Sequence, residues 1–217
     1  MIAGILLASG ASTRFGGDKL LATLEGRPVV RWSAEALAGA VDELVVVVRE
    51  DPHRSALRPK VRSAEGRSHD GSPIRRALEG IPIRWAINRD ADQGMSTTIR
   101  AGITALPAHV EAAIIALGDQ PLVDRHVVEA LAARWREGGA LAVQPCYEDG
   151  RGHPVLFDAS LFPAFHALEG DVGARAVLDS AGDALALLSV AGPRPIDVDT
   201  PDALDIVAAT LARRAPG

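Results

Sequence analysis

Cysteine is nearly absent from this sequence of 217 residues, because Cys146 is the only one. A lone cysteine cannot form an internal disulfide, and no group of Cys and His residues has the spacing of a zinc site. Long apolar runs are also missing, since none approaches the roughly 18–20 residues that a membrane-spanning helix needs. These absences exclude an internal disulfide, a zinc module of familiar spacing and a membrane-spanning protein.

A strong excess of charge of one sign is missing as well. The chain has 23 basic and 28 acidic residues, so its formal net charge is −5, and this balance gives no reason to expect nucleic-acid binding. The apolar segment Ile2–Ala8 has no positively charged flank and runs directly into a glycine-rich loop, so we expect a strand there and not a signal peptide. The sequence therefore predicts a soluble cytoplasmic protein without a nucleic-acid or membrane partner.

Lysine is the rarest of the charged residues. Lys19 and Lys60 are the only two lysines, beside 21 arginines. Because lysine is so rare in this chain, its presence in the loop at Lys19 is more informative about function than a lysine in an average sequence would be.

Short aliphatic runs alternate with segments of helical periodicity along the chain. The strands that we expect are Ile2–Ala8, Leu44–Val48, Ile83–Ile87, Ala112–Leu117 and Ala140–Val143. The helices that we expect run from Pro28 to about Ala40, over Ser96–Leu106, and along the apolar stripes between Val127 and Trp135 and between Leu204 and Leu211. This alternation predicts an α/β fold, one domain over residues 1–217, with a mostly parallel, doubly wound, Rossmann-like sheet.

The stretch Asp51–Gly71 is the exception to this alternation. It is rich in Pro, Gly, Ser and charged residues, and it has almost no apolar periodicity. Such a composition buries too little apolar surface to order itself, so we expect a long, mobile surface insertion within the domain.

A glycine- and serine-rich loop follows the first expected strand. It does not fit a Walker A loop, because five residues separate Gly10 from Gly16 and Lys19 is followed by Leu20. The motif G-x-G-x-x-G of dinucleotide sites occurs nowhere in the chain. The small residues still allow backbone N–H groups to approach a phosphate, with Arg14 and Lys19 as its cations, at a strand end where open α/β sheets bind ligands. The alternative is a loop whose glycines only turn the chain.

Five segments of the chain carry a resemblance to a known family. They are Leu7-Ala-Ser-Gly-Ala-Ser-x-Arg-x-Gly-x-x-Lys-Leu-Leu21, Gly94-Met-Ser-Thr-Thr-Ile-Arg-Ala-Gly-Ile103, Gly118-Asp-Gln-Pro-Leu122, Arg151-Gly-His-Pro-Val-Leu-Phe157 and Asp197-Val-Asp-Thr-Pro-Asp202. In order and spacing they resemble the molybdenum cofactor nucleotidyltransferases, which are MobA-like NTP transferases, and the cytidylyl-transferring group most of all. The resemblance covers nearly the whole chain except the insertion. It implies a fold of the nucleotide-diphospho-sugar transferase type.

Two of these segments supply carboxylates. The segment Gly118-Asp119-Gln120-Pro121 directly follows the expected strand Ala112–Leu117, so Asp119 lies on the same edge of the sheet as the first loop. Asp199 ends a short segment of alternating apolar residues, Ile196-Asp-Val-Asp. Two carboxylates beside a phosphate would repel it unless a divalent cation lay between them, and Mg²⁺ accepts one or two carboxylates together with phosphate oxygens. The resemblance implies that Asp119 and Asp199 bind Mg²⁺, with Asp197 as a substitute for Asp199.

Each of these carboxylates also has a purely structural interpretation. Asp119 precedes Pro121 closely enough to shape a turn. Thr200-Pro201-Asp202 has an N-cap residue, a proline at the first helical position and an acid in the first turn, which is a favourable start for a helix.

The resemblance also implies which residues bind the two substrates. Lys19, Arg14 and Asp119 would be catalytic, the acceptor would meet His153 and Gln120, and the nucleotide contacts would be Ala8, Ser9, Gly10, Lys19, Asn88, Thr98 and Asp119. The amide of Asn88 suits a base edge or a ribose, and free N–H groups where the helix begins at Ser96 suit phosphate or sugar oxygens. The structural alternatives are helix capping by these hydroxyls and a buried histidine without a ligand.

The first loop also indicates which nucleotide base the protein would bind. Guanylyl-transferring relatives tend to have Gly-Gly after the first strand and cytidylyl-transferring ones Ala-Ala-Gly, whereas this chain has Ala8-Ser9-Gly10. A side chain at Ser9 narrows the space beside the base, which disfavours a purine. We therefore expect transfer of CMP from CTP to the phosphate of the molybdenum cofactor (molybdopterin), with Mg²⁺ as cofactor and release of pyrophosphate, and a molybdenum hydroxylase as the recipient.

Two alternatives stay open. One is transfer of a guanylyl or other nucleotidyl group to a different small phosphorylated acceptor. The other is a maturation chaperone that binds the cofactor and hands it to a molybdenum hydroxylase with little turnover of its own. The cations and acids quoted above argue against a pure carrier, which has no need of a site for metal and phosphate.

Overall fold

A computed structural model describes residues 1–10, 15–50, 73–171 and 173–214. The insertion expected at 51–71 and the expected phosphate contact Arg14 lie outside these residues. The described strands are β1 (Ile2–Ala8), β2 (Thr23–Leu24), β3 (Arg27–Pro28), β4 (Glu43–Arg49), β5 (Arg84–Asn88), β6 (Ala112–Leu117), β7 (Ala142–Tyr147), β8 (Gly150–Arg151), β9 (Val155–Asp158) and β10 (Leu185–Ser189).

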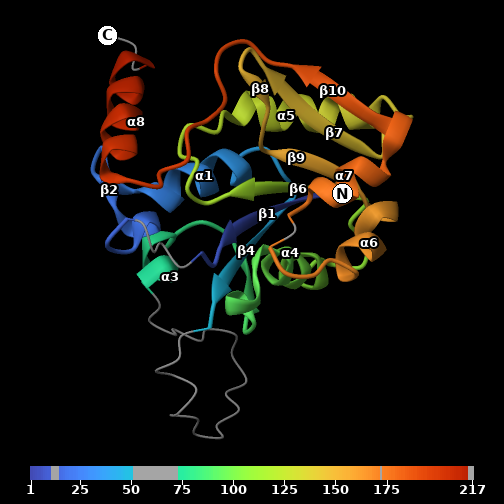
Figure 1. Cartoon of the computed structure of the whole chain (residues 1–217), viewed down its shortest axis with the longest axis horizontal. Helices are drawn as coiled ribbons and strands as arrows, with labels where there is room; N and C mark the ends of the chain where they lie inside the picture. Colours follow the sequence, from blue (N-terminus) through green and yellow to red (C-terminus); the bar gives the residue numbers. More distant parts are fainter. Residues whose placement is uncertain (11–14, 51–72, 172, 215–217) are drawn as a thin grey trace, which may run out of the picture.

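The helices follow the strands in alternation, as expected (Figure 1). They are α1 (Val29–Ala38), α3 (Pro73–Ala77), α4 (Met95–Thr104), α5 (Arg125–Arg136), α6 (Phe162–His166), α7 (Arg175–Ser180) and α8 (Pro201–Arg214). Short 3-10 turns lie at η1 (Lys19–Leu21), η2 (Ala91–Gln93), η3 (Ala159–Leu161) and η4 (Gly182–Ala184). Every helix that the periodicity predicted is present, with its ends within a few residues of the prediction.

The main sheet has the strand order β10-β7-β9-β6-β1-β4-β5, with β8 paired to β7. Strands β5, β4, β1 and β6 are parallel to one another, and β10 is parallel to β7. Only β9 and β8 run in the opposite direction to the strands that they pair with. The predicted α/β fold with a mostly parallel sheet is therefore confirmed, and β9 and β10 are strands that the sequence pattern did not reveal.

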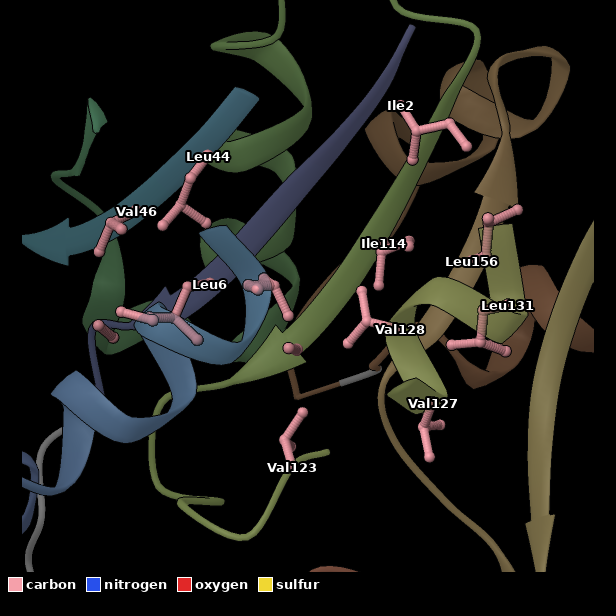
Figure 2. Packing of buried hydrophobic residues seen from close by; sticks show 14 of the residues in the cluster. Ile2, Leu6, Leu44, Val46, Ile114, Val123, Val127, Val128, Leu131 and Leu156 are labelled. Carbon is pink, nitrogen blue, oxygen red and sulfur yellow. The ribbon is translucent and has the colours of Figure 1, made fainter. Parts of the chain in front are cut away.

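Strand β1 lies near the middle of the sheet because its residues are aliphatic on both faces. Leu6 packs in a core cluster with residues of α1 and α5, whereas its neighbour Ile5 packs in a second cluster with residues of α4, α6 and α7. This alternation follows from the twofold period of a strand, and a strand covered on both faces reads as a continuous apolar run. Figure 2 shows the first cluster, where Val128 of α5 points toward Ile114 of β6.

A third, smaller cluster fixes the C-terminal part of the described chain. Val198 and Val207 of this part are fully buried against Leu24, Val29 and Leu122. Helix α8 therefore packs beside the β2–β3 hairpin, at one side of the molecule (Figure 1). At its start, the Ala203 N–H donates to the Thr200 hydroxyl at 3.2 Å, as the capping sequence predicted.

Helix α4 approaches the sheet unusually closely. A Cβ atom built on its Gly102 would lie 2.6 Å from Cγ2 of Ile5 in β1. Glycine thus lets the helix backbone approach the middle of the sheet, which brings the first turn of α4 to the end of β1. None of the described helices combines the length and the apolar character that crossing a membrane would require.

Candidate active site

The carboxyl ends of β1 and β6 meet at one edge of the sheet, because the two strands are paired in parallel. The turn after β6 is held close to β1, since the Gly118 N–H donates to the Leu7 carbonyl oxygen at 3.0 Å. A Cβ on Gly118 would lie only 3.0 Å from that same oxygen. The next residue, Asp119, therefore faces the segment that follows β1, where η1 begins at Lys19.

Lys19 joins two acids from distant parts of the chain. Its Nζ atom is 2.5 Å from Oδ2 of Asp119 and 2.6 Å from Oδ1 of Asp199. The side chains of Lys19, Asp119 and Asp199 are 13%, 19% and 47% exposed. Burial lowers the pKa of Lys19, but the hydrogen bonds and charges of the two aspartates outweigh it, so that the net shift is upward. The lysine therefore carries its full positive charge between two carboxylates at neutral pH.

Asp199 reaches this edge of the sheet because both the side chain and the backbone of the preceding residue, Val198, are held in place. The Val198 side chain is buried in the third core cluster. Its backbone N–H donates to the carbonyl oxygen of Asp119 at 2.9 Å. The segment before α8 is therefore fastened to the turn that carries Asp119, and the two aspartates can share one cation.

A pocket of about 460 Å³ opens at this edge of the sheet. Its lining contains Leu7, Ser9, Gly10, Lys19, Leu20, Arg49, Ala91, Gly94, Met95, Thr98, Leu117, Asp119, Asp171, Asp197 and Asp199. The structure thus brings together six residues that the sequence singled out for nucleotide or metal binding. They are Ser9, Gly10, Lys19, Thr98, Asp119 and Asp199.

Asp197, the expected substitute for Asp199, also lines the pocket. Its Oδ1 accepts a hydrogen bond of 2.8 Å from Nε2 of Gln120. Burial, aided by the charges of Asp119 and Asp199, raises the pKa of Asp197. Gln120 itself is buried and is absent from the pocket lining, so its contact with the site passes through Asp197.

A hydroxyl network connects the end of β1 to the first turn of α4. The hydroxyl oxygens of Ser9 and Thr98 are 2.6 Å apart, and Nδ2 of Asn88 donates to Thr97 and to Thr98 at 2.9 Å each. The Asn88 oxygen accepts the Asp90 N–H at 3.0 Å. Asn88 is buried and does not line the pocket, so its amide holds the network while Ser9 and Thr98 face the cavity.

The first turn of α4 differs from the expectation of free N–H groups. The Ser96 N–H donates to the carbonyl oxygen of Gly170 at 3.1 Å, and the Thr97 N–H lies 3.3 Å from the Gly94 carbonyl. Gly94 has a φ of 105°, and a Cβ there would lie 2.4 Å from the Gly170 backbone. A loop that arrives from far along the chain therefore covers this helix start, which no local pattern in the sequence indicated.

His153 lies in a second pocket, of about 410 Å³. This cavity shares Leu7, Met95 and Leu117 with the first one, so the two are adjacent parts of one cleft. Burial lowers the pKa of His153, which favours the neutral ring. No described residue forms a hydrogen bond with its Nδ1. Ala8, an expected nucleotide contact, lines neither cavity but a smaller hollow that shares Ser9 and Gly10 with the first pocket.

Several lining residues were missed from the sequence. Arg49 closes β4 at the same edge of the sheet, donating to Asp92 at 2.6 Å, and the rule that ligands bind at strand ends could have found it. Asp171 lines the first pocket, and Gln144 and Arg175 line the second. These three had no local signal, because their place depends on how the second half of the chain packs.

The described residues hold no group of three or more His, Cys, Asp and Glu side chains with metal-binding geometry. Two carboxylate oxygens do converge on one cationic centre, Lys19 Nζ. Carboxylate and phosphate oxygens are the ligands that Mg²⁺ prefers, and one or two carboxylates are its usual share from a protein. The carboxylates of Asp119 and Asp199 therefore fit Mg²⁺, provided that phosphate oxygens supply further ligands.

The carboxyl edge of this α/β sheet thus holds a cleft in which a lysine lies between two carboxylates, and open α/β sheets bind their ligands at such edges. Residues 4–185 match the MobA-like NTP transferase domain, and the chain belongs to this family. The protein is accordingly a nucleotidyltransferase, as the sequence predicted.

Curated relatives cover most of the chain. Nicotine blue oxidoreductase of Paenarthrobacter nicotinovorans is 33% identical over 186 residues, which are 82% of this chain and 81% of the relative. Purine catabolism protein PucB of Bacillus subtilis (strain 168) is 28% identical over 210 residues, 94% of each chain. Molybdenum cofactor guanylyltransferase of Cereibacter sphaeroides is 33% identical over 155 residues, 70% of this chain and 65% of the relative.

Solved structures share the fold. Rv0371c of Mycobacterium tuberculosis H37Rv superposes with a TM-score of 0.75 at 23% identity, covering 96% of this chain and 97% of its own. A CMP:2-keto-3-deoxy-manno-octonic acid synthetase solved with CTP has a TM-score of 0.71 at 16% identity and covers 99% of each chain. At these identities the likeness establishes the nucleotide-diphospho-sugar transferase type of fold.

Proposed function

We propose that this nucleotidyltransferase moves CMP from CTP to the terminal phosphate of a molybdopterin-type cofactor and releases pyrophosphate. The observation that carries the proposal is the convergence of Lys19, Asp119 and Asp199 on one point beside a pocket of about 460 Å³. The family and the relative named molybdenum cofactor guanylyltransferase support the choice of acceptor. A molybdenum hydroxylase would then receive the finished cofactor.

Asp119 and Asp199 would hold Mg²⁺. When bound, the ion supplies charge neutralisation at the nucleotide phosphates. Asp197, whose Oδ1 accepts a hydrogen bond from Gln120, also lines the pocket and is the proposed alternative to Asp199 as a metal ligand.

In the transfer, an oxygen of the acceptor phosphate forms a bond to the α-phosphorus of CTP. The bond from that phosphorus to the pyrophosphate oxygen breaks, and its electron pair leaves with pyrophosphate. The acceptor phosphate is already ionised at neutral pH, so no strong base is required. Lys19 would neutralise the departing pyrophosphate, and Arg14, outside the described residues, is proposed to share this task. Positioning and electrostatics then provide the rate.

Cytosine is proposed as the base because a side chain at position 9 would narrow the space beside the base, which disfavours a purine. The Ser9 hydroxyl is fixed by Thr98, and Asn88 fixes Thr98 in turn, so the side chain cannot turn aside without breaking these bonds. Ser9 and Gly10 both line the pocket, which supports contacts between the nucleotide and the end of β1.

The acceptor is proposed to lie in the second pocket. His153 and Arg151 line it, and the shared wall of Leu7, Met95 and Leu117 leads directly to the first pocket. A neutral His153 can both donate and accept hydrogen bonds, which suits the heterocycle of a pterin. Gln120 does not line this pocket, so we propose that it serves the acceptor side only through Asp197.

A nucleotide panel tests the proposal. Pyrophosphate release is measured with CTP, GTP, ATP or UTP, together with Mg²⁺ and molybdenum cofactor. We expect CTP to be preferred, and Lys19→Ala and Asp119→Asn each to lower the rate roughly a hundredfold, which corresponds to about 3 kcal/mol of lost transition-state stabilisation. Asp183→Asn, an exposed acid-to-amide change on η4, serves as the control and should leave the rate unchanged.

The panel also separates the alternatives. A preference for GTP, or turnover only with another phosphorylated acceptor, would keep the enzyme class and change the substrate. Tight binding of the cofactor without consumption of any nucleotide would identify a maturation chaperone. A redox role, which the name of the Paenarthrobacter relative suggests for that protein, would appear as NADH or NADPH oxidation, although the chain has no G-x-G-x-x-G motif.

A further inference from the structure

Lys19 binds one oxygen of each of the two carboxylates that are proposed to hold the metal. Its ammonium lies 2.5 Å from Asp119 Oδ2 and 2.6 Å from Asp199 Oδ1. The two carboxylates come from positions 100 and 180 residues away, so the lysine is what neutralises them where they meet. An ammonium group and a divalent cation held by the same two carboxylates would repel each other, so each weakens the binding of the other.

We propose that Lys19 exchanges partners during the catalytic cycle. Without nucleotide it holds Asp119 and Asp199 together and keeps metal affinity low. The phosphates of an incoming nucleotide draw the ammonium away, and the two carboxylates become free for the metal. This inference rests on the proposed function, and it adds an order of events: metal binds weakly to the free protein and tightly together with the polyphosphate.

The architecture supports such an exchange. Lys19 is the first residue of the short turn η1, and its flexible four-carbon stem lets the charge move between partners in the pocket that it lines. The carboxylates are less free, since the Asp119 turn and the Val198 segment are joined by a backbone hydrogen bond of 2.9 Å. The mobile cation and the fixed anions therefore belong to different elements.

Metal binding without nucleotide tests the first half of the exchange. Mn²⁺ affinity is measured by electron paramagnetic resonance of the free ion for the full chain and for Lys19→Met, which keeps an apolar stem and removes the charge. We expect Lys19→Met to bind Mn²⁺ at least tenfold more tightly than the unmodified protein. Arg49→Met is the matched control, because it removes a positive charge from the same pocket without touching either aspartate, and it should change affinity less than threefold.

The scarcity of lysine provides the second test, in the unmodified protein. Lysine labelled with ¹³C at Cε gives two side-chain signals, one each from Lys19 and Lys60, and Lys60→Arg assigns them. We expect magnesium pyrophosphate, a probe that does not depend on the base, to shift the Lys19 signal. Mg²⁺ alone at the same concentration should leave it in place.

Two results would overturn the exchange. Equal Mn²⁺ affinity of Lys19→Met and the unmodified protein would mean that the lysine does not compete, and a Lys19 signal unmoved by magnesium pyrophosphate would mean that it does not change partners. Either result leaves the proposed function intact if the nucleotide panel shows transfer. Absence of Mn²⁺ binding in both proteins overturns the exchange and the metal assignment of Asp119 and Asp199 together.

Discussion

The backbone N–H of Val198 and the carbonyl oxygen of Asp119 form a hydrogen bond of 2.9 Å, which joins the segment before α8 to the turn after β6. This bond explains how Asp199 comes to face Lys19 across 180 positions of sequence. The position of Asp199 therefore depends on the small core cluster that buries the side chain of Val198.

Truncation of Val198 should reduce activity as well as stability. Val198→Ala and Val207→Ala each remove two methyl groups from the same fully buried cluster, so both should lower the free energy of unfolding by about 2 kcal/mol. Only Val198 adjoins Asp197 and Asp199, so its variant alone should lose a further factor of about ten in kcat. Urea titration and pyrophosphate release check the pair. Equal kcat in the two variants would show that the cluster does not position Asp199.

Gly102→Ala should force α4 away from the sheet. The new Cβ would lie 2.6 Å from Cγ2 of Ile5, and both groups belong to packed elements, so we expect a loss of about 1–3 kcal/mol of stability. Urea titration of the single variants and of the double variant with Ile5→Ala measures the coupling. The cost of Gly102→Ala should be smaller in the Ile5→Ala background. Additive costs would contradict a steric origin.

The base preference should respond to the volume of residue 9. Ser9→Gly removes the side chain that narrows the pocket, and we expect the ratio of kcat/KM for GTP to that for CTP to rise about tenfold. Ser9→Ala is the matched control, because it loses the hydrogen bond to Thr98 and keeps the Cβ. It should retain the preference of the parent protein. An equal change in both variants would instead assign the preference to the hydroxyl network.

Tyr147 should make stability sensitive to alkaline pH. Burial, followed by the charges of Asp124 and Asp149, raises its pKa to about 12. Its hydroxyl donates to the His153 carbonyl at 2.9 Å. The unfolded phenol ionises near 10, so the stabilisation is complete below pH 10 and is lost as pH rises toward 12. The loss amounts to as much as about 3 kcal/mol.

Comparison with Tyr147→Phe isolates this contribution. Free energies of unfolding in urea are measured for both proteins from pH 8 to 11.5. The difference between them should shrink above pH 10, because phenylalanine cannot ionise. A difference that stays constant over this range would show that the phenol ionises equally easily in both states.

Much of the fold could be predicted because its signals are local. The aliphatic runs of β1, β4 and β6 and the apolar stripes of α5 and α8 report burial directly, and the structure has these elements where they were expected. Strand β9 has only four residues, Val155–Asp158, and follows a proline, which is too little for a periodic signal. Strand β10 is half-buried at the edge of the sheet and lacks a clear alternation.

The site could be predicted in part for the same reason. Ser9, Lys19 and Asp119 follow strands that the pattern identified, and the rule that ligands bind at strand ends places them together. The Gly170 carbonyl accepts a hydrogen bond from the first turn of α4. This contact depends on tertiary packing, so the spacing of residues in the sequence could not predict it. Asn88 was expected to contact the nucleotide because an amide suits a base edge or a ribose. In the structure its amide donates to Thr97 and Thr98 instead, and the sequence alone does not reveal these partners.

The reversed direction of β9 has a consequence for how the cleft can diversify. A parallel strand contributes to this rim through the residues after it, whereas β9 does so through the residues before it, Arg151 to His153. Substitutions in the residues that precede β9 can therefore change the wall of the second pocket without altering the segments that carry Lys19 and Asp119. The reversed strand β9 thus puts the residues proposed to bind the acceptor and the residues proposed to act in the transfer on separate elements.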